Sequence, residues 1–173
     1  MIVFKTNRLI IKTLEQSNIN DFSALLTDSN ILKLIPQKPF SPTEIAQRFK
    51  DNLNLSPEDF KTKKCVCGIF KKNSMEMIGL SLFLINENND KELGYRFKAP
   101  YWGHGYGSET AKAMIDYYFY TLNESKVFAD VNTKNIASLK ILSKFMLPVK
   151  EFFNPRDNCT DRRFEIRINQ WIN

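Results

Sequence analysis

Hydrophobic positions in the first third of the chain follow two different patterns. Residues 8–14 read as a strand, whereas residues 18–27 place their apolar side chains on one face of a helix. The segment 41–44 reads Ser-Pro-Thr-Glu, which is a capping box with proline at the first helical position. Because Ile45 and Phe49 follow at a spacing of four residues, a second helix is predicted there.

Two apolar runs in the middle of the chain predict a β-hairpin. Residues 64–70 and 75–85 read as strands, and the short polar segment between them fits a turn. The second run is nearly all apolar, as a central strand buried on both faces would be. After a polar loop, residues 92–98 form a further predicted strand, which Pro100 helps to end.

Helical and extended patterns alternate in the rest of the chain. We predict a helix at 108–122, a strand at 126–131, a helix at 136–146, and closing strands at 149–154 and 163–168. The predicted order is therefore β-α-α-β-β-β-α-β-α-β-β. This order indicates an α/β (α+β) fold with helices over the faces of a mixed sheet, and residues 1–173 fit the size of one domain.

Composition adds an expectation about location. The longest apolar stretch, residues 77–85, is about half of the roughly 20 residues that a membrane span needs. The N-terminus lacks a signal-peptide pattern. We therefore expect a soluble, cytoplasmic protein with no membrane partner.

The cysteines predict thiols rather than disulfides or a metal site. There are three, an odd number in a chain without an export signal. Cys65 and Cys67 share one face of a predicted strand, but a structural zinc needs four ligands and the chain has one histidine. We expect buried, reduced cysteines and no metal.

The formal charge of +6 permits several kinds of partner and does not choose among them. Nucleic acid, a phosphate-bearing cofactor and an acidic protein would all suit a basic surface. The basic residues are scattered, however, and no helix-turn-helix, zinc-finger or RNA-binding signature is present. Direct nucleic-acid binding is therefore not expected.

The most informative segment is the glycine-rich turn between the strand at 92–98 and the helix at 108–122. Gly103, Gly105 and Gly107 allow backbone conformations closed to other residues and leave room for a ligand beside the amides. Together with the unpaired N–H groups of a helix start, these amides form an anion site suited to a pyrophosphate. A tight turn that only packs a helix on a sheet is the alternative interpretation.

This segment resembles the coenzyme A loop of the GNAT acetyltransferases, Arg/Gln-x-x-Gly-x-Gly/Ala. The whole chain is similar to their RimJ/RimL-type branch, because residues 6–9 (Thr-Asn-Arg-Leu), 92–95 (Glu-Leu-Gly-Tyr) and 135–138 (Asn-Ile-Ala-Ser) also match. The resemblance implies a mostly antiparallel sheet, acetyl-CoA as cosubstrate, an amine acceptor on a protein N-terminus or a small molecule, and a monomer or homodimer. It also implies cofactor contacts from Tyr95, Phe97, Trp102, Gly103, His104, Gly105, Tyr106, Gly107, Ser108 and Asn135.

Acyl transfer to an amine requires an unprotonated amine, a polarised thioester carbonyl and a proton for the departing thiolate. The resemblance implies that the strand with Tyr95 splays from its neighbour, that a carboxylate is the base and that a helix side chain is the acid. Glu92 is the candidate base, with a structural carboxylate paired to a lysine as the alternative. Ser138 is the candidate acid, and Asn135 is either a cofactor contact or a helix cap.

The chain departs from the family pattern at three places. Trp102 stands at the head of the loop in place of Arg or Gln, and Met146 and Leu147 replace a common Gly-Phe. Leu142 occupies the position of a tyrosine that often serves as the acid. Two further functions therefore remain open at this point: a coenzyme A-binding protein without turnover, and a basic partner-binding module.

Overall fold

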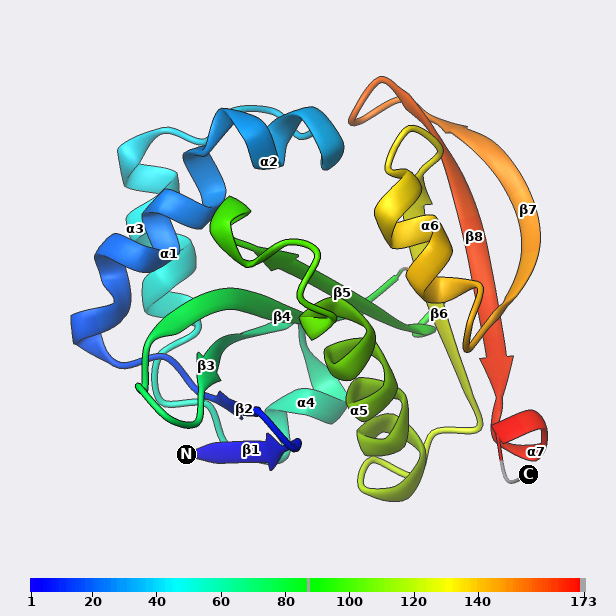
Figure 1. The fold of residues 1–173 in the computed structure, drawn as a ribbon, viewed down its shortest axis with the longest axis horizontal. Helices are drawn as coiled ribbons and strands as arrows, with labels where there is room; N and C mark the ends of the chain where they lie inside the picture. The colour runs from blue at the N-terminus through cyan, green and yellow to red at the C-terminus, as the bar shows by residue number, and fades with distance from the viewer. Residues whose placement is uncertain (87, 172–173) are drawn as a thin grey trace.

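The computed structural model describes residues 1–86 and 88–171. Within them, eight strands form one sheet in the order β1-β2-β3-β4-β5-β6-β8-β7 (Figure 1). The strands are β1 (Ile2–Lys5), β2 (Leu9–Lys12), β3 (Cys65–Lys71), β4 (Met77–Ile85), β5 (Lys91–Phe97), β6 (Lys126–Asn132), β7 (Leu147–Asn154) and β8 (Cys159–Arg167). The β5–β6 pair is parallel and the other neighbouring pairs are antiparallel, which confirms the mixed, mostly antiparallel sheet.

Helices cover both faces of this sheet, as predicted (Figure 1). One core contains α1 (Ile19–Thr27), α2 (Ser29–Leu34) and α3 (Pro42–Asp51), and the other contains α4 (Asp59–Thr62), α5 (Tyr106–Tyr120) and α6 (Ile136–Leu142). Successive strand residues enter opposite cores, since Met77 packs with the first group and Ile78 with the second. The nearly continuous apolar run of β4 is therefore buried on both faces.

Local signals account for the starts of the predicted helices. Ser41 Oγ accepts a hydrogen bond from the Glu44 amide at 3.2 Å, and the Ser41 amide donates to Glu44 Oε2 at 2.7 Å. This capping box starts α3 at Pro42, and Ile45 and Phe49 are buried on its inner face. The helix predicted at 18–27 is α1, and the hairpin predicted at 64–85 is β3–β4.

The predicted element order was incomplete. It lacked β1, α2, α4 and a final short helix, α7 (Ile168–Trp171). Strand β1 lies at the edge of the sheet without a buried residue, so its sequence lacks the apolar alternation of a core strand. The helix predicted at 136–146 ends at Leu142 and is followed by a turn, in which the Phe145 and Met146 amides donate to the Leu142 carbonyl at 2.9 and 2.8 Å.

The cysteines lie where the strand pattern placed them. Cys65 and Cys67 are buried on one face of β3, and burial raises the pKa of the Cys65 thiol to about 11. Residues 1–86 and 88–171 contain no cluster of three or more His, Cys, Asp or Glu side chains that would suit a metal ion. Over the same ranges, no helix has both the length and the apolar character required to cross a bilayer.

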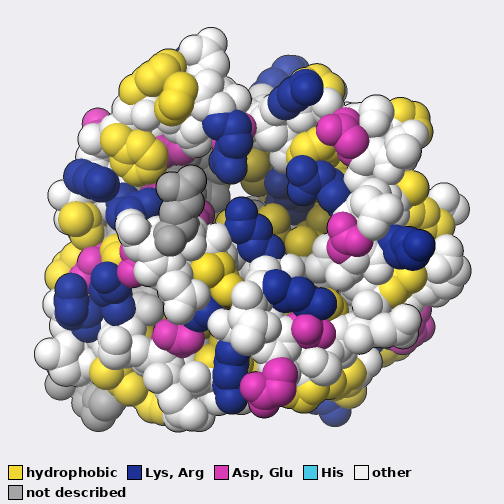
Figure 2. Space-filling view, turned by 180° about the vertical axis from the view of Figure 1, so that it is seen from behind, with side chains coloured by type: hydrophobic (Ala, Val, Ile, Leu, Met, Phe, Trp, Pro, Cys, Tyr) yellow, Lys and Arg dark blue, Asp and Glu magenta, His cyan; other side chains and the backbone are white. Residues whose placement is uncertain are grey.

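On the face shown in Figure 2, basic side chains lie among acidic ones. Figure 2 shows one face on which lysine and arginine side chains stand singly or in small groups, with acidic side chains between them. Many of the basic residues also form ion pairs, such as Lys63 with Asp59 at 3.0 Å and Arg162 with Glu151. The excess positive charge therefore does not form a continuous strip along this face.

Candidate active site

Strands β5 and β6 separate close to the start of their pairing. Glu92 opposite Phe128 is the one parallel pair between them within the described residues. The Lys98 amide donates to the Ile78 carbonyl on β4, so by alternation the backbone groups of Tyr95 and Phe97 point away from β4 into the gap. The splay expected from the family resemblance is confirmed.

The glycine turn leads directly from this gap into α5. Gly103 and Gly105 have φ of 79° and 80°, in the left-handed region that favours glycine, and Gly105 caps the helix. The first helical hydrogen bond runs from the Glu109 amide to the Gly105 carbonyl at 3.1 Å. No carbonyl within the described residues accepts from the amides of 105–108. These amides and the positive end of the helix dipole form a site for an anion.

Gly107 serves a different purpose from the other two glycines. A Cβ atom there would lie 2.8 Å from Ile141 Cδ1 and 3.6 Å from Tyr95 Cε2. The missing side chain therefore allows α5 to pack closely against α6 and β5. Its contribution to the anion site is a backbone amide brought near the gap.

The turn between β1 and β2 braces the glycine turn. Arg8 donates to the His104 carbonyl at 3.0 Å and to Glu109 Oε2 at 2.7 Å, and Thr6 Oγ1 donates to Glu109 Oε1 at 2.6 Å. Burial opposes ionisation of Glu109, but the hydrogen bonds from Thr6 and Arg8 outweigh it and lower the pKa. The Arg8 guanidinium also lies 4.5 Å from the centre of the Tyr106 ring. These contacts explain the Thr-Asn-Arg-Leu motif, whose role the sequence did not reveal.

Trp102 and His104 each make a contact that holds the glycine turn in place. The Trp102 indole N–H donates to the Phe97 carbonyl at 2.8 Å, which ties the head of the loop to the end of β5. Arg8 places a cation beside the turn, although the family's usual Arg or Gln is absent at position 102. His104 is exposed, and its backbone carbonyl makes the contact with Arg8.

Glu92 lies at the point where β5 and β6 part. Burial and, to a lesser extent, the neighbouring Asp130 raise the pKa of its carboxyl group to about 7, and Arg163 opposes both. Arg163 holds Asp130 through two hydrogen bonds, of 2.8 and 2.6 Å. The adjacent Lys91 instead lies 3.9 Å from Glu124, so the alternative of Glu92 as a lysine-paired structural carboxylate is not supported.

The start of α6 faces Glu92's strand across the gap. Asn135 Oδ1 accepts from the Ser138 amide at 3.1 Å, so Asn135 caps the helix as its sequence position suggested. Burial raises the pKa of the Tyr95 hydroxyl to about 12, and the neighbouring Ser138 opposes part of that rise. No group among the described residues makes a well-aligned hydrogen bond with the Tyr95 hydroxyl. This unpartnered phenol was not identified from the sequence.

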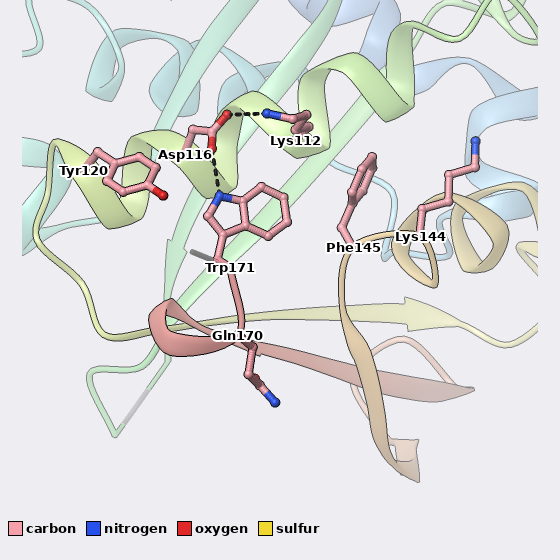
Figure 3. A pocket seen from close by; sticks show the side chains of 7 residues that line it. All are labelled: Lys112, Asp116, Tyr120, Lys144, Phe145, Gln170 and Trp171. Atoms are coloured by element: carbon pink, nitrogen blue, oxygen red, sulfur yellow. Dashed lines mark hydrogen bonds and ion pairs between the residues drawn. The ribbon is translucent and has the colours of Figure 1, made fainter. Parts of the chain in front are cut away.

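A cavity of about 110 Å³ lies between the end of β5 and the start of α6, and its lining within the described residues does not include Glu92. Tyr95, Asn135 and Ser138 line one side, and Arg96 with residues of the α2 region lines the other. A second, more open groove of about 430 Å³ lies between α5, the end of α6 and α7 (Figure 3). There Lys112 pairs with Asp116 at 3.0 Å, whereas Lys144 reaches Ser108 Oγ at 3.3 Å in the first turn of α5.

Residues 8–145 match the family model described as the acetyltransferase (GNAT) domain. The chain belongs to the GNAT acetyltransferases. It is accordingly an acetyl-CoA-dependent N-acetyltransferase by family.

Three relatives illustrate this membership. The N-acetyltransferase p20 of Bacillus licheniformis is 29% identical over 164 residues, which cover 93% of this chain and 90% of that protein. The spermidine N-acetyltransferase of Vibrio cholerae, solved with CoA and spermine, superposes with a TM-score of 0.79 at 17% identity, covering 95% and 98% of the two chains. RimL, a ribosomal L7/L12 α-N-protein acetyltransferase solved with coenzyme A, gives 0.78 at 15%, covering 98% and 99%. At these identities the two structures establish the shared fold.

Proposed function

We propose that this GNAT protein transfers an acetyl group from acetyl-CoA to a primary amine, on a small molecule or a protein N-terminus, at the splay between β5 and β6. The observation that carries the proposal is the half-buried Glu92 at the point where the strands part, whose carboxyl group has a pKa raised to about 7. A general base is most effective when its pKa lies near the working pH.

The residues around the splay fit the cosubstrate, whose bound thioester would supply the activated acetyl group. The free amides of 105–108 suit the pyrophosphate, with the Lys144 ammonium beside Ser108 as a further cation. Gly103, His104 and Trp102 form the approach to that site. The backbone groups of Tyr95 and the amide of Phe97 that face the gap suit the amide-containing pantetheine arm, as does the Asn135 side chain in the cavity lining.

Glu92 would draw the proton from the acceptor amine, directly or through water. Near neutral pH about half of its carboxyl groups are ionised, because the pKa is about 7. Arg163 holds the neighbouring Asp130 carboxylate in place through two hydrogen bonds.

The departing sulfur needs a proton, and two hydroxyls are available. Leu142 stands at the usual tyrosine position and is buried, so it contributes no donor. Ser138, the acid candidate from the sequence, lines the cavity, and the neighbouring Tyr95 lines it too, with a hydroxyl that stays protonated at neutral pH and makes no well-aligned hydrogen bond among the described residues. We assign the proton donation to this Tyr95–Ser138 pair.

A coenzyme A-binding protein without turnover is the alternative, and Leu142 is the feature that favours it. The decisive experiment is incubation with isotopically labelled acetyl-CoA and a library of amines and peptides, followed by mass spectrometry and by measurement of thiol release. Labelled products that disappear with Glu92→Gln are expected. Tight cofactor binding without any labelled amine would establish the alternative.

The setting of the enzyme is part of the same proposal. We treat residues 1–173 as one catalytic domain, because the described strands form one continuous sheet. A cytoplasmic enzyme acting as a monomer or homodimer suits the motif resemblance. Fractionation of cells and light scattering of the purified protein measure these two properties.

A further inference from the structure

Arg96 is a buried cation without a matching anion. Its side chain is 7% exposed and lies on the face of β5 covered by α1 and α2. It donates to the Leu25 carbonyl at 3.3 Å and to Gln37 Oε1 at 3.1 Å, both neutral acceptors. Its Nε has no hydrogen-bond partner among the described residues, and no carboxylate of those residues pairs with it.

Such a residue is costly to fold. A buried charge is normally paired, because loss of hydration is repaid only by a close opposite charge and complete hydrogen bonding. Burial, assisted by the nearby Arg48, lowers the pKa of Arg96 to about 10, yet at that value the guanidinium remains charged at neutral pH. The side chain therefore keeps an uncompensated positive charge and free donors in the interior.

The Arg96 side chain borders the cavity next to the reacting groups, with its unpaired Nε shielded from solvent. Arg96 lines the same cavity of about 110 Å³ as Tyr95 and Ser138. The remaining wall on its side is apolar and comes from Ile31, Leu34 and Ile35. An apolar wall with one unpaired guanidinium suits a ligand that has a hydrocarbon part and an anionic end.

Polarity along β5 orients such a ligand. Glu92 and Arg96 are four residues apart and lie on the same face of the strand, roughly 13 Å from each other along the backbone. The acidic Glu92 suits an amine towards one end of the strand, and Arg96 suits an anion towards the other. A polyamine has no group for the second position and would bring a further positive charge towards a buried cation.

We propose that Arg96 binds a carboxylate of the acceptor, so that the acceptor class is an amino acid or a short peptide with a free carboxyl group rather than a polyamine. This inference rests on the proposed function, because it places the acceptor at the splay. Arg96 is thus a specificity residue that fixes which amines enter the cavity productively.

Binding of matched ligands tests the inference without relying on turnover. N-acetyl amino acids are compared with their primary amides, which differ by the absence of the negative charge, by calorimetric titration into protein saturated with coenzyme A. The wild type should bind at least one carboxylate form on the order of thirtyfold more tightly than its amide, the low end expected for a desolvated charge pair. Arg96→Met should abolish this ratio, and Arg96→Lys should retain part of it.

Controls separate specificity from folding. Arg162→Met removes an exposed arginine of β8 and should keep the wild-type ratio. Coenzyme A affinity and the melting profile of Arg96→Met show whether its fold is intact. If Arg96→Met is misfolded, the acid-to-amide affinity ratios of the wild type and of Arg96→Lys provide the test. Equal binding of acids and amides by the wild type would overturn the inference, as would a ratio unchanged in Arg96→Met. Failure of the proposed function is a separate result, namely no acetylated amine despite coenzyme A binding.

Discussion

Ionisation of Glu92 predicts a pH-dependent effect of its replacement. The carboxylate is the active form and its pKa is about 7. Glu92 can therefore act as a base in the wild type above pH 7, whereas below pH 7 it is mostly protonated and inactive. Glu92→Gln should reduce kcat by about 10² to 10⁴ above pH 7, with the deficit shrinking as pH falls below it. Initial rates of both proteins are measured at pH values on either side of 7. The ratio of the wild-type rate to the Glu92→Gln rate at each pH does not depend on ionisation of the acceptor amine, which affects both rates equally. A ratio independent of pH would remove Glu92 as the base.

The same raised pKa predicts a stability change of known sign. The folded-state pKa of about 7 lies above the ordinary 4.5, so folding favours the protonated carboxyl group. Wild-type unfolding free energy should therefore fall as pH rises from 4.5 through 7, by up to about 3 kcal/mol, and this loss should be absent in Glu92→Gln. Chemical denaturation of both proteins at acid and alkaline pH measures the difference. Parallel stability profiles would show that Glu92 titrates as an ordinary surface carboxylate.

Tyr95 and Ser138 predict different combinations of rate and stability loss. Tyr95→Phe removes a buried oxygen that makes no well-aligned hydrogen bond within the described residues, so stability should change little while kcat falls by roughly tenfold to a thousandfold. Ser138→Ala should lower kcat over the same range, with a stability loss of about 1 kcal/mol or less because Ser138 lies in the first turn of α6. Turnover and melting temperature measured on the same preparations distinguish the two. Full activity in Tyr95→Phe would leave Ser138 or water as the donor.

At the scale of elements, the strand–turn–helix unit depends on backbone conformation at Gly105. A Cβ there would be held at φ 80° and would lie 3.4 Å from Arg8 Nη2. Gly105→Ala should cost about 1 to 2 kcal/mol and weaken acetyl-CoA binding on the order of tenfold, because the first-turn amides would shift. Gly103→Ala has the same strain but open space around its Cβ, so its loss of affinity should be smaller. Equal cofactor affinity in wild type and Gly105→Ala would contradict the turn's proposed role.

At the scale of the whole molecule, cofactor binding should raise the melting temperature. The site joins the β1–β2 turn, β5, α5 and α6, which lie together only in the folded state. At about 100 times its Kd, acetyl-CoA should add about 2.7 kcal/mol and raise the melting temperature by roughly 5 to 10 °C. Pantetheine, which lacks the pyrophosphate, should produce a much smaller shift in the same thermal scan. An equal shift from both ligands would contradict the anion site on α5.

Local features were predictable because their causes are local in the chain. Three features depend only on residues that are close together in the sequence: the capping box at Ser41, the buried run of β4 and the glycine turn at 103–107. The family motifs extended this to the cofactor loop and to Glu92 and Ser138 as candidates. Elements without such a signal were missed, above all the edge strand β1. This strand has no buried residue and is extended because its backbone pairs with β2.

The sequence by itself determined the order of the main elements, the helix starts, and the glycine turn that exposes backbone amides to an anion, since these follow from hydrophobic period, capping and glycine conformations. Only the tertiary structure decided which side chains contact one another and how deeply each is buried. Arg8 meets Glu109 across 101 positions of the chain, Tyr95 meets Ser138 across the splay, and burial sets the pKa of Glu92 near 7. The physical reason is that desolvation and charge pairing depend on distances in space, which no spacing along the chain encodes.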